Sequence, residues 1–319
     1  MKLDIDLLKR LLTIDHPSKR EWPMLTAIIN ECYKIDNITF EIDGYSNLII
    51  TRNTNNPLYY PLVVAHTDCV LEHENKSLKE VKGKIYGVDA LSRKQIGLGA
   101  DDTCGIVCAI QLLREIPDLK VIFTTEEECG FNGAEYVTEN LSFFLDVSYM
   151  IQADRHGAND LIVYTNCIHS VSEEWLNEIT PLMAEFKYSE EYGLGTDIGV
   201  MADILEISGV NISCGYYREH TEFEYIILDQ LQNCLNFMEA IIKTVPLTKQ
   251  YTINPDQYRF YGSYGRYGSY LNNNIANTNQ KRSLTDPYYV PRDYPYDEDD
   301  DPCSHCTTYN CSSCEHLPY

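Results

Sequence analysis

Basic residues are scarce in this chain of 319 residues. It contains 25 Lys and Arg against 48 Asp and Glu, a formal net charge of −23. This balance argues against nucleic acid as the main partner, because phosphate backbones are bound by Lys and Arg. Residues 251–319 hold 5 of the basic and 9 of the acidic side chains, which leaves 20 against 39 in the first 250 residues. The acidity therefore belongs to the main body, where it favours solubility and offers ligands for metal cations.

Long hydrophobic runs are also missing. The longest apolar stretches, such as residues 62–65, fall far short of the ~20 residues that a membrane helix needs. At the N-terminus, Asp4 and Asp6 occupy positions where a signal peptide carries positive charge, and Lys9 and Arg10 interrupt the apolar run. We therefore expect neither a signal peptide nor a membrane partner.

Cysteine is distributed unevenly along the chain. Eight of the twelve cysteines occur singly, mostly beside apolar residues, and the other four are crowded into residues 303–314. Isolated cysteines of this kind are typical of small buried thiols in a reducing compartment. We therefore expect a cytoplasmic protein and treat the last four cysteines separately.

Helices and apolar strands alternate through the first 245 residues. The patterns predict helices over residues 3–14, 21–34, 103–115, 131–140, 173–186 and 228–243. They predict strands over residues 40–42, 47–51, 62–65, 119–124, 147–153, 161–165 and 210–214. This alternation indicates an α/β fold, a three-layer sandwich with a mixed, largely parallel central sheet.

The composition changes after Pro246. Tyr, Gly, Asn and Pro dominate residues 251–302, and 12 of the 25 tyrosines lie after residue 250. Neither helical nor strand periodicity is visible there, which is typical of a disordered low-complexity segment. We divide the chain into a folded domain (1–248), an acidic low-complexity tail expected to be disordered (249–302) and a Cys-rich end (303–319).

Five segments at strand ends or helix starts carry metal-ligand side chains. They are residues 65–68, 99–102, 126–130, 152–154 and 218–220. Each segment alone is weak evidence for a metal site. A His after a strand is usually structural, a Glu run is usually solvated, and an Asp pair can cap a helix. Functional residues of parallel sheets gather beyond the carboxyl ends of the strands. Imidazole and carboxylate ligands suit zinc, and two divalent ions would offset the repulsion among the carboxylates.

The order of these segments resembles a known clan. The order is similar to that of the co-catalytic dizinc exopeptidases, with His-x-Asp first, then Gly-Ala-Asp-Asp, Glu-Glu-x-Gly, Asp and His. That clan includes peptidase T, zinc carboxypeptidases of the glutamate-releasing type and compact zinc aminopeptidases. Residues 97–102 are similar to peptidase T, and residues 127–134 are closer to the aminopeptidase branches. The resemblance covers about residues 1–245.

The resemblance implies a ligand set. It gives His66 and Asp154 to the first zinc ion, Glu128 and His220 to the second, and Asp101 to both as the bridge. Two Zn²⁺ ions are implied, with Co²⁺ or Mn²⁺ as alternatives.

The resemblance also implies two catalytic residues. Asp68 would orient the His66 imidazole. Glu127 would act as the general base that takes a proton from the attacking water and passes it to the leaving amine. Asp102 is the alternative to Asp101, and Glu126 is the alternative to one member of the Glu pair.

Spacing adds to the functional prediction. Asp154 and His220 are 66 residues apart, and the predicted strands and helices already fill this interval. An inserted lid domain therefore does not fit, and we expect a single compact catalytic domain. Carboxypeptidases of the clan use a lid Arg, so an aminopeptidase acting on small peptides is favoured. The alternatives are an N-acyl amino acid amidohydrolase or carboxypeptidase, or an inactive relative that acts as a binding or structural protein.

Three further patterns leave alternatives open. Residues 195–197 resemble a site-edge motif of the clan and equally suit an ordinary turn. Residues 216–218 are candidates for the substrate pocket or for core packing. Cys167 and His169 share one face of a strand, but no orienting or oxyanion partner is visible, which argues against a thiol enzyme.

The Cys-rich end has the spacing of a structural zinc site. Its ligands would be Cys303, Cys306, Cys311 and Cys314, in two Cys-x-x-Cys pairs. A third Zn²⁺ is the favoured interpretation, and disulfides or free thiols are the alternative. A zinc knuckle on an acidic tail would dock a protein partner rather than assist catalysis.

Overall fold

The computed structural model describes residues 1–73, 75–166 and 168–254. Its helices are α1 (Ile5–Leu12), α2 (Trp22–Cys32), α3 (Ala100–Glu115), α4 (Asn132–Val137), α5 (Leu141–Phe144), α6 (Glu173–Phe186), α7 (Asp197–Leu205) and α8 (Leu228–Thr244). Most of the predicted tail and the whole Cys-rich end lie outside the described residues, including the predicted third zinc site.

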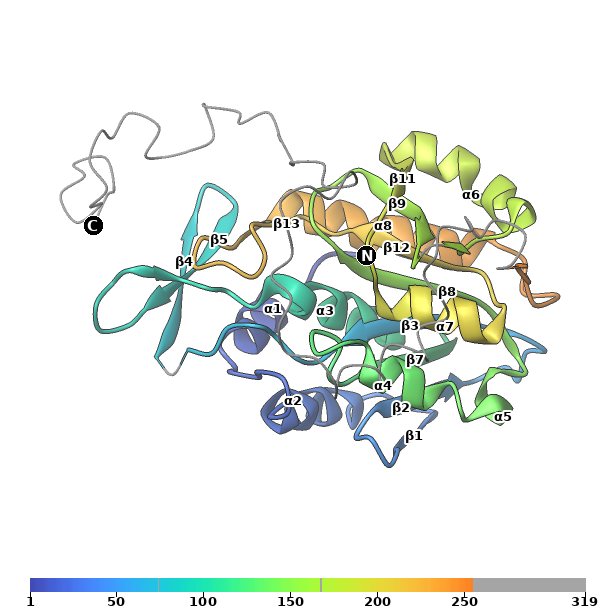
Figure 1. The fold of residues 1–319 in the computed structure, drawn as a ribbon, viewed down its shortest axis with the longest axis horizontal. Coiled ribbons are helices and arrows are strands. Elements are labelled where there is room, and N and C mark those ends of the chain that lie inside the picture. Colours follow the sequence, from blue (N-terminus) through green and yellow to red (C-terminus); the bar gives the residue numbers. More distant parts are fainter. Residues whose placement is uncertain (74, 167, 255–319) are drawn as a thin grey trace, which may run out of the picture. The chain divides into compact units, whose positions relative to one another are not determined.

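Nine strands form the central sheet (Figure 1). They are β1 (Ile38–Ile42), β2 (Leu48–Asn53), β3 (Tyr60–His66), β7 (Asp118–Thr124), β8 (Val147–Arg155), β9 (Asp160–Thr165), β10 (Ile168–His169), β11 (Ser189–Tyr192) and β12 (Gly209–Ser213). The order is β1-β2-β7-β3-β8-β12-β9-β10, and β11 pairs with β9. The four middle strands, β7, β3, β8 and β12, are mutually parallel, whereas β1, β2 and β10 pair antiparallel. The predicted α/β class with a mixed, largely parallel sheet is confirmed.

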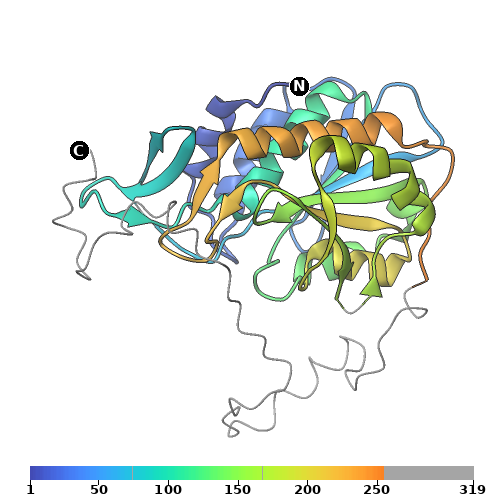
Figure 2. The ribbon, with the colours of Figure 1, turned by 90° about the horizontal axis from the view of Figure 1, so that it is seen from above.

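Both faces of this sheet are covered by helices. Every residue of β3 is buried, and its side chains alternate between two cores. Val63 packs in a core with residues of α1, α2, α3, α6 and α8, whereas Val64 packs in a core with residues of α4 and α7. Figure 2 shows α8, in orange, and α7, in yellow, on opposite sides of the central strands. A strand buried on both faces explains the unbroken apolar run at residues 62–65.

A second, antiparallel sheet was not predicted. It consists of β4 (Lys76–Val81), β5 (Lys84–Asp89), β6 (Gln95–Ile96), β13 (Tyr216–Tyr217) and β14 (Tyr225–Ile227). The order is β13-β14-β5-β4, and β6 also pairs with β5. Its strands are short or largely polar, so they lack the apolar runs that mark the central strands. This small sheet joins two distant parts of the chain, because β5 pairs with β6 and with β14.

Several predicted helices differ in their limits. Helix α3 begins at Ala100 rather than residue 103, and Asp101 and Asp102 in its first turn have non-helical backbone angles. The helix predicted at 131–140 is the shorter α4, and α5, which follows it, was not predicted. Helix α7 was not predicted. Within the described residues, no helix is both long and apolar enough to cross a membrane.

The chain after α8 returns to the central sheet. The Tyr251 N–H donates to the carbonyl of Ser148, and the Ser208 N–H donates to the carbonyl of Tyr251. The Tyr251 side chain is buried, with its ring centroid 6.2 Å from that of Tyr149. Residues up to at least Tyr251 are therefore held against the folded part of the chain.

Candidate active site

The predicted ligands lie at one edge of the central sheet. His66 is the last residue of β3 and pairs in register with Thr124, the last residue of β7, after which the Glu run follows. On the other side of β3, Val64 pairs with Gln152 of β8, which places Asp154 level with His66. Because these three strands are parallel, their carboxyl ends bring the side chains together.

Asp101 lies between two histidines that are distant in sequence. Its Oδ1 is 2.9 Å from Nε2 of His66, and its Oδ2 is 3.2 Å from Nε2 of His220. The two oxygens of one carboxylate therefore face different imidazoles. This is the arrangement that a bridging carboxylate requires.

Each histidine has a further carboxylate beside it. Nε2 of His66 is 3.5 Å from Oδ1 of Asp154, and Nε2 of His220 is 2.7 Å from Oε1 of Glu128. Three groups of side chains could each hold a metal ion, because the ligand atoms inside each group lie within 4.8 Å of one another. They are His66–Asp102–Asp154, His66–Glu127–Glu128 and Asp101–Glu128–His220. The structure thus brings all five predicted ligands together.

The charge balance of this cluster suits divalent cations. Burial and the nearby Asp101 carboxylate raise the pKa of Asp154 to about 8. Burial and the Asp154 carboxylate raise the pKa of Asp102 well above its usual range. Such repulsion among buried acids is relieved when cations share them. The donor set, imidazole nitrogen with carboxylate oxygen, is one that zinc accepts.

The pKa values of the two histidines are raised as well, which favours the charged form of each imidazole. Burial alone would lower the pKa of His66, but the carboxylates of Asp154 and Asp101 outweigh it and raise the pKa well above the usual value. Hydrogen bonds to Asp101 and Glu128 raise the pKa of His220 to about 11. Both imidazoles therefore lie in a strongly negative environment, the environment that a cation would also find favourable.

Asp68 connects the histidine strand to the Glu loop. Its Oδ1 accepts the N–H of Glu127 at 3.0 Å, and its Oδ2 accepts the N–H of Glu128 at 3.2 Å and the Ser18 hydroxyl at 2.7 Å. Nδ1 of His66 lies 3.0 Å from the Asp68 carbonyl oxygen and 3.3 Å from the same Oδ1. Burial alone would raise the pKa of Asp68, but the hydrogen bonds from His66 and Ser18 lower it. An ionised Asp68 therefore holds an imidazole and two backbone amides at once.

The three glutamates of the Glu run have different surroundings. Glu127 is buried, and burial together with Asp154 and Asp197 raises its pKa well above the usual value, against the influence of His66. Glu126 instead accepts hydrogen bonds from the Tyr45 hydroxyl at 3.0 Å and from the Asn132 amide at 3.2 Å. Glu126 belongs to none of the three candidate metal groups.

Two of the sequence patterns whose role was left open, residues 195–197 and residues 216–218, contribute side chains to the candidate site. The Thr196 hydroxyl is within 2.9 Å of Gln152 Oε1 and 3.4 Å of Asp154 Oδ2, so residues 195–197 border the cluster. Asp197 is buried and accepts a hydrogen bond from the Thr124 hydroxyl, and burial raises its pKa to about 7. The buried Tyr216 hydroxyl donates to Asp154 Oδ1 at 3.2 Å.

One residue of the site was missed entirely. Glu224 is buried, and its carboxylate accepts hydrogen bonds from the backbone of the turn that carries Asp101. In sequence it resembles any other acid in an exposed loop, because its partners are main-chain amides, which no residue type reveals.

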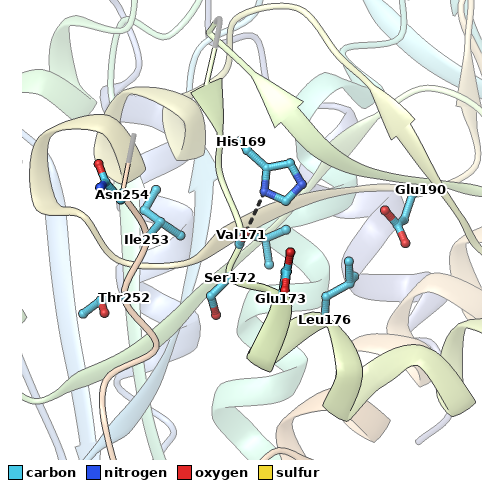
Figure 3. A pocket seen from close by; sticks show the side chains of 9 residues that line it. All are labelled: His169, Val171, Ser172, Glu173, Leu176, Glu190, Thr252, Ile253 and Asn254. Atoms are coloured by element: carbon cyan, nitrogen blue, oxygen red, sulfur yellow. Dashed lines mark hydrogen bonds between the residues drawn. The ribbon is translucent and has the colours of Figure 1, made fainter. Parts of the chain in front are cut away.

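His169 lies at another place. It lines a pocket of about 470 Å³ whose other walls come from β11, α6 and residues 252–254, and which shares no residue with the candidate metal groups (Figure 3). Nδ1 of His169 lies 2.7 Å from the carbonyl oxygen of Val171. Cys167 lies outside the described residues.

The candidate ligand set is of the kind that metal-dependent hydrolases with a two-ion centre use. Residues 62–244, more than half of the chain, match the model of peptidase family M20/M25/M40, and the chain belongs to this family. The resemblance noted from the order of the motifs is therefore confirmed. A comparison with curated protein sequences found no match.

Solved structures of similar fold agree with this assignment. Aminopeptidase PepT from Bacillus cereus has a TM-score of 0.60 and 16% identity, with 75% of this chain and 97% of that one covered. A tripeptidase from Staphylococcus aureus has a TM-score of 0.59 and 16% identity, with coverage of 75% and 96%. The TET1 peptidase of Pyrococcus horikoshii has a TM-score of 0.55 and 16% identity, with coverage of 75% and 98%. At these identities the likeness concerns the fold.

Proposed function

We propose that this protein is a two-zinc exopeptidase, an aminopeptidase that removes the first residue of short peptides. The observation that carries the proposal is the position of Asp101, whose two carboxylate oxygens face His66 and His220 separately. His66 and Asp154 would hold one ion, and Glu128 and His220 the other. Co²⁺ or Mn²⁺ would suit the same ligands.

Bound zinc ions would polarise the scissile carbonyl and lower the pKa of the attacking water. Glu127 would accept a proton from that water and deliver it to the leaving amine. Its burial beside His66 and Glu128, within a candidate metal group, supports this role. The contacts of Glu126 with Tyr45 and Asn132 support Glu127 rather than Glu126 as the base.

The remaining polar contacts would keep this geometry. Asp68 would hold the His66 ring through Nδ1 and, through the two backbone amides, the loop that carries Glu127 and Glu128. Tyr216 would hold Asp154 through its hydroxyl. Partners of this kind behind the ligands commonly set metal affinity and ligand orientation.

Two observations support an aminopeptidase without a lid domain. All described residues belong to one compact unit, and the interval from Asp154 to His220 is occupied by β9, β10, α6, β11, α7 and β12. The neighbours of similar fold include proteins described as an aminopeptidase and a tripeptidase. We also propose a cytoplasmic location, because the seven cysteines of the described residues are unpaired and six of them are buried.

A substrate panel tests the proposal. The purified full chain is analysed for metal content and assayed on aminoacyl, dipeptide, tripeptide and N-acyl amino acid substrates, with and without a chelator. We expect two ions per chain and chelator-sensitive release of the N-terminal residue. Preferential cleavage of N-acyl amino acids or release of the C-terminal residue would replace the aminopeptidase assignment. A metal-loaded chain that cleaves none of them would identify an inactive relative.

A further inference from the structure

Helix α3 opens with an irregular turn, in which Asp101 and Asp102 have non-helical backbone angles, and Asp102 Oδ1 caps the regular part of the helix by accepting the Gly105 N–H at 2.9 Å. Its N-cap residue is Gly99, with φ of +72° and no side chain to accept a hydrogen bond. The first N–H groups of a helix have no partner within the helix, and Ser, Thr, Asp or Asn at the N-cap usually accepts one of them. The glycine allows the left-handed backbone of this turn but has no side chain that could accept from the N–H groups of residues 98–101, which precede the regular helix.

A carboxylate from another part of the chain takes this role. Oε2 of Glu224 accepts the N–H groups of Leu98 at 2.9 Å and Gly99 at 2.6 Å, and Oε1 accepts those of Ala100 at 2.9 Å and Asp101 at 3.1 Å. Four donors on one carboxylate form a set of charge-assisted hydrogen bonds. The negative charge at the helix N-terminus is also favourable to the helix dipole.

Glu224 belongs to the segment that carries His220. The loop of residues 218–224 connects β13 to β14, and β14 pairs with β5. Further along the same edge β5 pairs with β6, which ends at Ile96 just before the turn of residues 97–101. The segments of Asp101 and His220 are thus joined twice, through β5 and through the Glu224 carboxylate.

We propose that Glu224 is a positioning residue for the metal centre, which sets the separation of Asp101 and His220 and so the affinity for the ion that these two share with Glu128. This inference rests on the proposed two-metal function. A carboxylate anchored to the Asp101 amide and located four residues after His220 links the two ligands directly. Their facing atoms, Oδ2 and Nε2, are 3.2 Å apart.

The test compares Glu224→Gln with Glu222→Gln. Gln keeps the size of the side chain, but its NH₂ group cannot accept, so two of the four backbone N–H groups lose their acceptor. Glu222 is an exposed acid two residues away, and its replacement removes the same charge without touching the turn. Metal-free proteins are titrated with Zn²⁺ by calorimetry, absorption spectra of the Co²⁺ forms are recorded, and melting of the metal-free proteins is followed.

We expect Glu224→Gln to weaken the binding of one ion, the one shared by Asp101, Glu128 and His220, by about 10–100-fold, the range typical of residues behind metal ligands, and to change the Co²⁺ spectrum. Glu222→Gln should match the wild type in both. A lower melting temperature of Glu224→Gln with wild-type affinity and spectrum would show a purely structural role and overturn the inference.

Glu224→Asp keeps both acceptor oxygens on a side chain one methylene shorter. This variant replaces Glu224→Gln in the metal titration if Glu224→Gln does not fold. It should weaken the same ion by a smaller factor. Failure of both variants to fold would make Glu224 a residue of the fold and overturn the positioning role. A wild type that binds two ions while the variant binds them equally well overturns this inference alone. A wild type that binds fewer than two overturns the proposed function with it.

Discussion

The two halves of the candidate metal centre are built differently. His66 and Asp154 extend from adjacent parallel strands of the central sheet, and the His66 side chain is 1% exposed. His220 comes from a loop of the small antiparallel sheet, and its side chain is 46% exposed. Asp101 lies between them. One half is thus fixed by a core packed on both faces, whereas the other depends on a few hydrogen bonds, four of them to the buried Glu224 carboxylate.

The strand half is thus the rigid part of the centre, and the loop half is the part that a substrate can reach. A substrate must reach the centre from the exposed half, because the strand half is enclosed by side chains of the core. The loop half must also keep its geometry without a core around it. The four hydrogen bonds of Glu224 supply part of this order, and the contact of His156 Nδ1 with Glu219 Oε1 at 2.8 Å adds to it. The predictions below test the contrast, beginning with the largest expected effect.

The largest effect is expected for Glu127→Gln. Gln fills the same space but cannot accept a proton, so turnover should fall by about 10²–10⁴-fold while both ions stay bound. Steady-state kinetics and metal analysis measure the two quantities. Glu126→Gln is the matched control, because that carboxylate faces Tyr45. If Glu126→Gln abolished turnover at full metal content and Glu127→Gln did not, the base would be one residue earlier.

Replacing each histidine by alanine compares the halves directly. His66→Ala removes a buried imidazole that contacts Asp68 and Asp101, so it should lose metal and also lower the melting temperature of the metal-free protein. His220→Ala removes a half-exposed ring, so it should weaken one ion by more than 100-fold, beyond the ~10–100-fold of residues behind the ligands. Its metal-free melting temperature should fall less than that of His66→Ala, because the His220 ring is half exposed and buries little apolar surface. Equal melting temperatures for the two variants would contradict the contrast.

The stability of the metal-free protein should fall as pH rises from about 6 to 9. Asp154 with a pKa near 8 and His220 with a pKa near 11 both bind protons more tightly in the folded chain than their usual values of 3.8 and 6.5 allow. A folded state that binds more protons is stabilised at low pH and loses that stabilisation as the protons leave. Thermal melting at pH 6 and pH 9 measures the change. A metal-free protein that melts higher at pH 9 would contradict it.

The smallest effect is expected for removal of residues 255–319. Every proposed catalytic residue lies before residue 221, so peptide hydrolysis and melting temperature should stay near wild type. A second truncation that ends at Gln250 also removes Tyr251, whose ring is buried and whose backbone pairs with Ser148 and Ser208. This second form should melt lower. Loss of most activity in the folded, metal-loaded longer form would assign the tail a part in the site or its assembly.

The sequence predicts the sheet-borne half of the site well, because its signals are local. The apolar runs at 62–65, 119–124 and 147–153 indicate buried strands, and the ligands follow directly at their ends. The order of the motifs then identifies the family. The small sheet is harder to predict, because strands such as β4 are polar and only partly buried, and β13 has two residues.

Glu224 and helix α7 illustrate a different limit. The partners of Glu224 are amides more than 120 residues away, so no spacing or periodicity in the sequence points to them. Helix α7 follows the Gly195-Thr196-Asp197 turn signal, and that signal concealed a helix start whose first residue, Asp197, is buried against Thr124. Pairwise tertiary contacts of this kind override local patterns.

The capping of α3 by Glu224 also has a consequence for the order in which the protein is made. A ribosome adding about 5–20 residues per second needs roughly six to twenty-five seconds to travel from Gly99 to Glu224. During that interval the newly made Asp101 turn has neither its anchoring carboxylate nor His220. The ligands on β3 and β8 are therefore made before His220, and full metal capture waits until the segment after β12 has left the ribosome.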